Sequence, residues 1–329
     1  KQNMESSEPN ALQRVVWIVF DELDEDALFA NRPPWLQLPV FDRIRHESII
    51  ATNVSQAGSD TIEAVPGMTV GRRVRQSSVI SGNKLELNFD NTSQRQTWRG
   101  EHNLFVKHAR VKSRQGIVGW YHPYCRIFAA ELTLCHTLFI GSASIQRQTD
   151  LAAMVMDQLA IINPFYRRLN AVKATKVLID RAPAAAANDQ LDFVFLHIPL
   201  PHQPTVFDAN ERHFTAANFS ADGYFHNAAA ADHLLGLIEN SMRKSGLWDK
   251  TAILITSDHP WRGRNIITGD PVSERVPFML KLPFQKAGFE FDQKMPAVVI
   301  RDLVLSLGAG EILVQKQFVD WVSLRGQNR

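Results

Sequence analysis

The 329-residue chain is poor in cysteine, in excess charge and in long apolar stretches. Its 36 Lys and Arg residues nearly balance 34 Asp and Glu residues, so the formal net charge is only +2. Without a cationic surplus a protein gains little by displacing phosphate counterions, and we expect no nucleic-acid partner. The longest apolar runs, such as Val15–Phe20, are far shorter than the roughly 20 residues that cross a bilayer, so no membrane span is expected here.

The two cysteines, Cys125 and Cys135, lie close together in the sequence. They can close a short disulfide loop in an oxidising compartment, or remain as two buried thiols in a reducing one. Too few other metal-binding residue types surround the pair to suggest a zinc site. Residues 1–12 form a polar tail, and a chain that starts at Lys1 suggests a mature or excised form.

Short apolar runs alternate with helical patterns over the remaining residues, 13–329, which we expect to form a single domain because no linker or repeat divides them. Four runs are typical of buried strands, and they are Val15–Phe20, Leu191–Ile198, Thr251–Asp258 and Val276–Leu282. Such alternation predicts an α/β fold, a three-layer α/β/α sandwich with a mostly parallel central sheet. We expect a helix over residues 150–173, and we expect the alanine-rich segment Ala182–Asp189 to be a flexible connection.

Ligand-type side chains stand at the ends of these predicted strands. Asp21 and Glu22 follow the first run, and Asp258 and His259 follow the third. Ligands bind beyond the carboxyl ends of the strands in such sheets, and two carboxylates with an imidazole form a mixed oxygen and nitrogen site for a divalent cation. Each residue alone could be a helix cap or a solvated charge, but their coincidence favours a metal site. Glu22 could be a ligand or a partner of the ligands.

The order of segments resembles the alkaline phosphatase superfamily, in particular its sulfatase-like branch with the lipoteichoic acid synthases and phosphoethanolamine transferases. VVWIVFDELDED resembles the opening strand with its acidic metal ligand, and TAILITSDHP resembles the T-x-x-x-x-S-D-H-G strand end. ERVPFML, PLPHQP and GWYHPY resemble the R-V-P strand, the P-H-x-P loop and the G-K-W-H segment. The likeness runs in a consistent order from about Val15 to Leu282, which is more specific than one short motif. It implies an alkaline phosphatase-like catalytic domain.

The nucleophile position distinguishes the branches of this superfamily. Sulfatases carry a modified Cys or Ser in a Cys/Ser-x-Pro-x-Arg motif, which is missing from SDTIEAVPGMTVGR. Thr61, followed by Pro66 and Met68, instead matches the Thr-x-x-x-x-Pro-x-Met spacing of the phosphoethanolamine transferases. We therefore expect Thr61 to be the nucleophile, with Ser59 as the second choice. A threonine that merely caps a helix is the alternative, and the two roles are compatible.

The resemblance assigns further roles to histidines and arginines. His202 or His197 would protonate the leaving oxygen or hold a phosphoryl oxygen, and His122 would contact a phosphoryl oxygen from its place in the G-K-W-H-like segment. A structural hydrogen bond remains an alternative for each histidine. Arg262 or Arg264 would supply the cation that this segment lacks.

Three departures from the family pattern stand out. Trp120 replaces the lysine of G-K-W-H, and Pro260 replaces the glycine after Asp-His, which restricts that loop. No histidine follows His259 in the sequence, so we expect a single divalent metal ion, with Mn, Zn, Mg and Ca all open.

The expected function is metal-dependent hydrolysis of a phosphoester, or transfer of its phospho group, through a phosphothreonine at Thr61. The alternatives are a sulfuric ester hydrolase and a catalytically inactive sulfatase-like binding module. The resemblance implies a phosphoester substrate, with a lipid or a glycan as candidate carriers. It also implies an extracytoplasmic location, periplasmic or at the cell surface, and leaves open a membrane anchor upstream of this chain.

Overall fold

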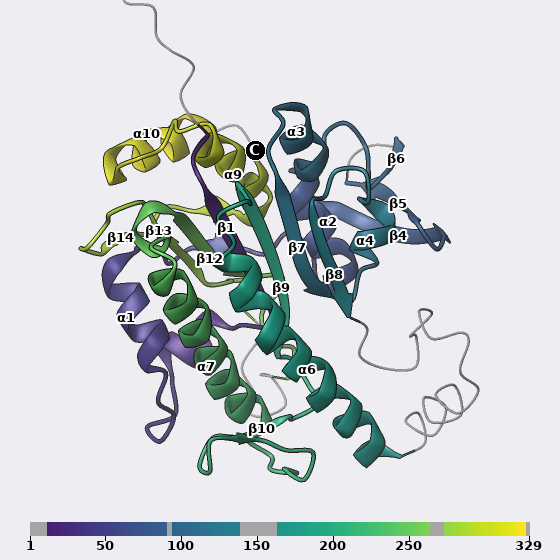
Figure 1. The fold of residues 1–329 in the computed structure, drawn as a ribbon, viewed down its shortest axis with the longest axis vertical. Helices are drawn as coiled ribbons and strands as arrows, with labels where there is room; N and C mark the ends of the chain where they lie inside the picture. The colour runs from purple at the N-terminus through teal and green to yellow at the C-terminus, as the bar shows by residue number, and fades with distance from the viewer. Residues whose placement is uncertain (1–11, 91–93, 139–162, 264–272, 327–329) are drawn as a thin grey trace, which may run out of the picture.

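The computed structural model describes residues 12–90, 94–138, 163–263 and 273–326. An eight-stranded sheet crosses the molecule in the order β14-β2-β13-β12-β1-β9-β7-β8 (Figure 1). Its strands, in chain order, are β1 (Val15–Asp21), β2 (Ile49–Ala51), β7 (Gln115–Trp120), β8 (Leu134–Leu138), β9 (Phe193–Pro201), β12 (Ala252–Ser257), β13 (Phe278–Lys281) and β14 (Phe289–Phe291).

The five neighbouring strands β12, β1, β9, β7 and β8 are all parallel. β13 is antiparallel to both of its neighbours, and β14 is parallel to β2. The predicted mostly parallel sheet is therefore confirmed. Because five parallel strands end at one edge, the residues that follow them are brought together there.

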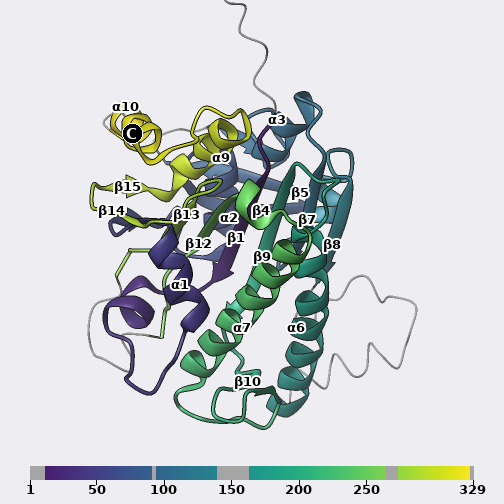
Figure 2. The same cartoon turned by 60° about the vertical axis from the view of Figure 1, so that its left-hand side comes forward.

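Helices cover both faces of the sheet, which confirms the three-layer sandwich (Figure 2). One face carries α1 (Pro39–Glu47), α6 (Pro164–Ala186) and α7 (Gly223–Lys244), and the other carries α2 (Thr61–Val70), α3 (Leu104–Arg110), α9 (Ile300–Gly308) and α10 (Gln315–Gly326). Every residue of β1 is buried, and its side chains alternate between the two cores, with Trp17 in one and Ile18 in the other. Full burial of each such side chain contributes about 1.5–3 kcal/mol.

A smaller antiparallel sheet lies beside α2. It is formed by β4 (Val74–Ser81), β5 (Lys84–Phe89) and β6 (Arg95–Thr97). One face of β5 is buried, through Leu85, Leu87 and Phe89. The remaining short elements are η1 (Asp26–Ala30), β3 (Val54–Ser55), α4 (Tyr124–Ile127), β10 (Phe207–Asp208), β11 (His213–Phe214), η3 (Trp248–Lys250), β15 (Met295–Pro296) and η4 (Ala297–Val299).

Two of the local predictions have clear outcomes. The expected alanine-rich connection is wrong from Ala182 to Ala186, because α6 runs through it. Alanine is the strongest helix former, and the run keeps the helix going past Pro183, close to its end. The predicted helix over 150–173 is confirmed only from Pro164, since residues 150–162 lie outside the described ranges.

Cys125 and Cys135 form a disulfide, which confirms one of the two alternatives and ties α4 to β8. Among the helices in the described part of the chain, none combines the length and the hydropathy of a membrane span.

Candidate active site

Two acidic side chains leave neighbouring strands at the same point. Phe20 of β1 pairs with Ser257 of β12, so Asp21 and Asp258 follow in register at the carboxyl edge of the sheet. The backbone of Glu22 is left-handed, with φ at 65°, and this turn directs the chain away from the strand immediately after Asp21. The pairing of these two strands therefore places the two carboxylates together.

Asp21, Asp258 and His259 form a compact, buried cluster. Each offers one ligand atom, and these atoms all lie within 4.8 Å of one another. Nε2 of His259 lies 3.7 Å from Oδ1 of Asp21 and 3.6 Å from Oδ2 of Asp258. Oδ1 of Asp21 is buried and has no hydrogen-bond partner among the described residues. A buried carboxylate oxygen without a partner is costly unless something binds it, so this cluster fits a divalent cation.

The surroundings of the cluster shift the pKa values of its two carboxylates in opposite directions. Burial, reinforced by the nearby Asp258 and Glu22, raises the pKa of Asp21 well above its usual value. Burial acts in the same direction on Asp258, but His259, His197 and the Thr61 hydroxyl together lower its pKa. Two carboxylates that crowd each other in a buried place favour a bound cation, which would relieve their repulsion.

Thr61 points into this cluster from the first residue of α2. Its Oγ1 donates a hydrogen bond to Oδ2 of Asp258 over 2.8 Å, and it lies 3.4 Å from both Oδ2 of Asp21 and Nε2 of His259. Asp60 occupies the N-cap position, so the Thr61 side chain does not cap the helix. The hydroxyl also stands near the positive end of the α2 dipole, where negative charge is stabilised.

Two buried histidines, His122 and His197, lie near Thr61 and are held by hydrogen bonds. His122 donates from Nε2 to the backbone oxygen of Thr61 over 3.1 Å, which fixes the start of α2. Nδ1 of His197 is hydrogen-bonded to the hydroxyl of Tyr124 at 2.8 Å. Burial lowers the pKa of His122 to about 3 and that of His197 to about 4, so both imidazoles are neutral at ordinary pH. A structural hydrogen bond was the alternative to a role in the reaction for each histidine, and both His122 and His197 form one.

A glycine makes the contact between Tyr124 and His197 possible. Gly119 of β7 pairs with His197 of β9, and a Cβ at this glycine would lie 2.9 Å from Cε2 of Tyr124. The absent side chain allows the Tyr124 ring to lie against the sheet and reach the imidazole. Nothing in the sequence pattern had singled out Tyr124, and its only signal is its place two residues after His122 in the GWYHPY segment.

His202 and Trp120 lie at the carboxyl edge of the sheet, at the ends of β9 and β7. His202 directly follows β9 and is half-buried, with its ring centroid 5.5 Å from that of Trp120. Burial lowers the pKa of His202. Trp120 is buried at 6% exposure and is the residue that the resemblance aligns with a lysine.

Arg262 pairs with two acidic side chains near the cluster. Its Nε lies 3.2 Å from Oε1 of Glu22, and its guanidinium also pairs with Asp60. Glu22 is thereby engaged with Arg262 and does not belong to the three-residue cluster. The side chain of Arg262 is 50% exposed and can reach a ligand from there. Arg264 lies outside the described residues.

Comparison with known proteins identifies the family of the chain. The model of the family described as Sulfatase matches residues 13–288. The chain belongs to the sulfatase family. Enzymes of this family depend on metal ions, which agrees with the Asp21, Asp258 and His259 cluster. None of the curated proteins matches the sequence.

Several solved structures of sulfatase-family fold resemble this protein at low sequence identity. The PsFucS1 sulfatase from Pseudoalteromonas sp. has a TM-score of 0.64 at 15% identity, over 91% of this chain and 68% of that one. The lipoteichoic acid synthase LtaP from Listeria monocytogenes gives 0.54 at 12% identity, over 91% and 72%. The phosphonate monoester hydrolase of Agrobacterium radiobacter gives 0.53 at 14% identity, over 90% and 74%. These similarities establish the fold.

Proposed function

We propose that this sulfatase-family protein is a metal-dependent phosphoester hydrolase or phospho-group transferase that uses Thr61 as its nucleophile. The carrying observation is that Oγ1 of Thr61 lies within 3.4 Å of Asp21, Asp258 and His259. A hydroxyl at a helix N-terminus, buried against three ligand-type side chains and not used as a cap, suits nucleophilic attack on an anionic ester.

The cation that we propose would be held by Asp21, Asp258 and His259. When bound, a divalent ion lowers the pKa of a nearby hydroxyl and neutralises negative charge on the substrate. The unpartnered Oδ1 of Asp21 supports this assignment.

The residues of the chain supply the remaining steps. Oγ1 of Thr61, oriented by its hydrogen bond to Oδ2 of Asp258, attacks phosphorus, the bond from phosphorus to the leaving oxygen breaks, and the hydroxyl proton is released to solvent. His202, half-buried at the strand end and neutral because burial lowers its pKa, donates an N–H hydrogen bond to the leaving oxygen, which departs as an anion and takes its proton from water. Arg262 binds a phosphoryl oxygen through its guanidinium fork. Water or an acceptor alcohol then attacks the phosphothreonine, the bond from phosphorus to Oγ1 breaks, and Thr61 regains its proton.

His197 has a supporting place in this proposal. It is fully buried and hydrogen-bonded to Tyr124, so it lies behind the reacting groups and contributes to their positions.

A sulfuric ester hydrolase is the second candidate, because the family and a neighbour such as PsFucS1 favour it. Against it, the segment around Thr61 contains no Cys or Ser in the Cys/Ser-x-Pro-x-Arg motif. Turnover of nitrophenyl phosphomonoester, phosphodiester and sulfate, measured for wild type and Thr61→Ala together with metal analysis, separates the candidates. Phosphoester turnover that Thr61→Ala abolishes supports the proposal, and sulfate turnover alone supports the second candidate. Metal-free protein that is inert to every ester would indicate a binding module.

We also propose an extracytoplasmic location. The disulfide between Cys125 and Cys135 supports it, because such bonds persist mainly in oxidising compartments.

A further inference from the structure

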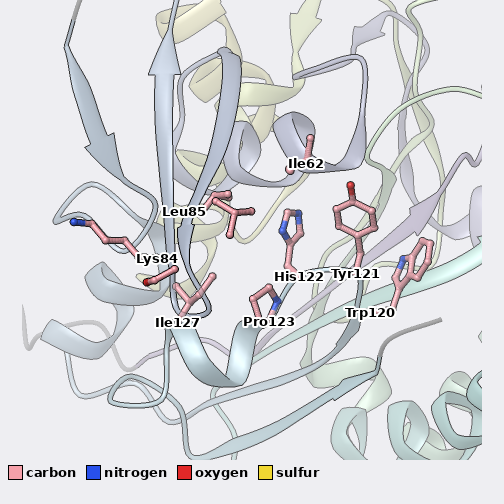
Figure 3. A pocket seen from close by; sticks show the side chains of 10 residues that line it. Ile62, Lys84, Leu85, Trp120, Tyr121, His122, Pro123 and Ile127 are labelled. Atoms are coloured by element: carbon pink, nitrogen blue, oxygen red, sulfur yellow. The ribbon is translucent and has the colours of Figure 1, made fainter. Parts of the chain in front are cut away.

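An apolar cavity is lined by Ile62 and His122, which both adjoin Thr61 (Figure 3). Its volume is about 330 Å³, and Ile62, Tyr121 and His122 line one side, with Leu85 across from them. Ile62 follows Thr61 in α2, and His122 is the residue that holds the Thr61 backbone oxygen. A group in this cavity would therefore belong to a molecule that also reaches Thr61.

The far wall of the cavity is the β4–β5 hairpin. Val79 of β4 is the cross-strand partner of Leu85 of β5, and both line the cavity. The hairpin is fixed to the active site by a hydrogen bond of 2.8 Å from Oγ of Ser77 to the backbone oxygen of Ile62. This contact sets the distance between the hairpin and the nucleophile, so the cavity is part of the architecture of the site.

The chemistry of the lining indicates what can bind. Lys84 is the one charged side chain among the described lining residues, and it is exposed at the outer part of the hairpin. Burial keeps His122 neutral, with its pKa lowered to about 3. Such a lining suits an uncharged, apolar group and disfavours one that carries several hydroxyls, since their hydrogen bonds with water would be lost.

The indole of Trp120 forms part of the lining. The side chain of Trp120 is 6% exposed, and its Nε1 has no hydrogen-bond partner among the described residues. Because this nitrogen is buried, Trp120 contributes the apolar surface of its ring to the wall of the cavity.

We propose that this cavity is a specificity pocket for an apolar substituent of the ester, of about the size of an aryl ring. The proposal rests on the proposed function, in which Thr61 reacts beside the pocket. An apolar cavity of about 150 Å³ is enough to bind benzene, so the observed volume accommodates an aromatic ring with room for its linkage. The substrate class is accordingly a phosphoric ester that bears a hydrophobic group, rather than an ester of a sugar or of glycerol.

Binding of two phosphonates tests the pocket without turnover. Calorimetry in buffer that contains Mn²⁺ would compare phenylphosphonate with methylphosphonate, which share the anionic group and differ in the apolar one. We expect the phenyl compound to bind wild-type protein about tenfold more tightly, from the apolar surface it buries. A variant that changes binding of the shared phosphonate group alters both affinities equally, so the ratio of the two affinities reports only on the apolar group.

Neighbouring residues of β4 provide matched variants. Val79 and Ile80 are both exposed, at 71% and 54%, and of the two only Val79 lines the cavity. Val79→Asp should lower the affinity ratio about fivefold, whereas Ile80→Asp should leave it unchanged. Leu85→Ala, which removes apolar contact without adding charge, should also lower the ratio.

Equal affinities of the two phosphonates for the wild type, or no binding of either, would overturn the pocket. The pocket would also be overturned if neither Val79→Asp nor Leu85→Ala changed the ratio of the two phosphonate affinities. A tenfold ratio in a protein without esterase activity would refute the proposed function and leave the pocket standing. Conversely, turnover that depends on Thr61, together with equal phosphonate affinities, would refute only the pocket.

Discussion

The hydroxyl of Thr61 lies 2.8 Å from Oδ2 of Asp258, although 197 positions separate the two residues in the sequence. The contact joins the start of α2 to the end of β12, so it forms only when the sheet and its covering helices are in place. It orients the oxygen that we assign as the nucleophile.

Removal of this hydroxyl should abolish the reaction. We predict that Thr61→Ala lowers kcat for the preferred phosphoester by about a thousandfold or more, because no other oxygen occupies its place. Thr61→Ser should retain measurable activity. Ser59→Ala is the matched control, since the Ser59 hydroxyl is exposed and, among the described residues, donates to Glu63, and it should keep wild-type kcat. Loss of activity in Ser59→Ala but not in Thr61→Ala would transfer the role to Ser59.

The three-residue cluster should determine metal content. Asp21→Asn and Asp258→Asn each remove a carboxylate charge from the cluster, so we predict that purified protein loses most of its bound metal in elemental mass spectrometry. Glu22→Gln should retain the metal, because Glu22 pairs with Arg262. Metal loss in Glu22→Gln with full retention in Asp21→Asn would contradict this account of the ligands.

Much of this site was predictable from the sequence, for a physical reason. Asp21, Asp258 and His259 follow apolar runs, and parallel strands bring their carboxyl ends to one edge whatever the details of packing. By contrast, the pairing of Glu22 with Arg262 depends on a left-handed backbone at Glu22, which no sequence pattern revealed.

Other features were hidden because they depend on packing between distant segments. The contact of Tyr124 with His197 needs the register that places Gly119 beside His197. The apolar cavity needs the hairpin to meet α2, which follows from the Ser77 contact. The secondary structure itself differs from the prediction at Ala182–Ala186, where the high helix propensity of alanine gives the end of α6 instead of a flexible connection.

The hydroxyl of Tyr124 should matter for rate more than for binding. Tyr124→Phe keeps the buried ring and removes the hydrogen bond to Nδ1 of His197, so we predict that kcat falls about fivefold to tenfold while KM changes little. Steady-state kinetics check this. A lower melting temperature with unchanged kcat would show instead that the hydroxyl only stabilises the fold.

His108 should make the protein less stable in acid. It is buried in α3, stacks on Phe193 at a centroid distance of 4.7 Å, and has no hydrogen-bond partner on either ring nitrogen among the described residues. Burial lowers its pKa from 6.5 to about 4. Between these values the unfolded chain binds a proton that the folded chain does not, so stability falls as pH decreases through this window.

We predict that this histidine costs about 2 kcal/mol of unfolding free energy between pH 7.5 and pH 5. His108→Leu should remove that part of the loss, whereas His46→Gln, at an exposed position, should not. Urea unfolding at the two pH values measures the difference. The same acid loss in His108→Leu as in wild type would contradict the assignment.

The disulfide should stabilise the edge of the sheet that carries β8. Replacing both Cys125 and Cys135 with Ser frees a loop with a sequence separation of 10, and we predict a loss of about 2–3 kcal/mol. Reductant should lower the melting temperature of the wild type and leave that of the double variant unchanged. Equal sensitivity of both proteins to reductant would contradict the prediction.

The most direct measurement is to trap the covalent intermediate. Metal-loaded protein is mixed with a nitrophenyl phosphoester, quenched in acid within a single turnover, and analysed by intact mass and peptide fragmentation. The account predicts one added phosphoryl group on Thr61, absent from Thr61→Ala. Nitrophenol release with no covalent adduct, or an adduct on any other residue, would contradict it.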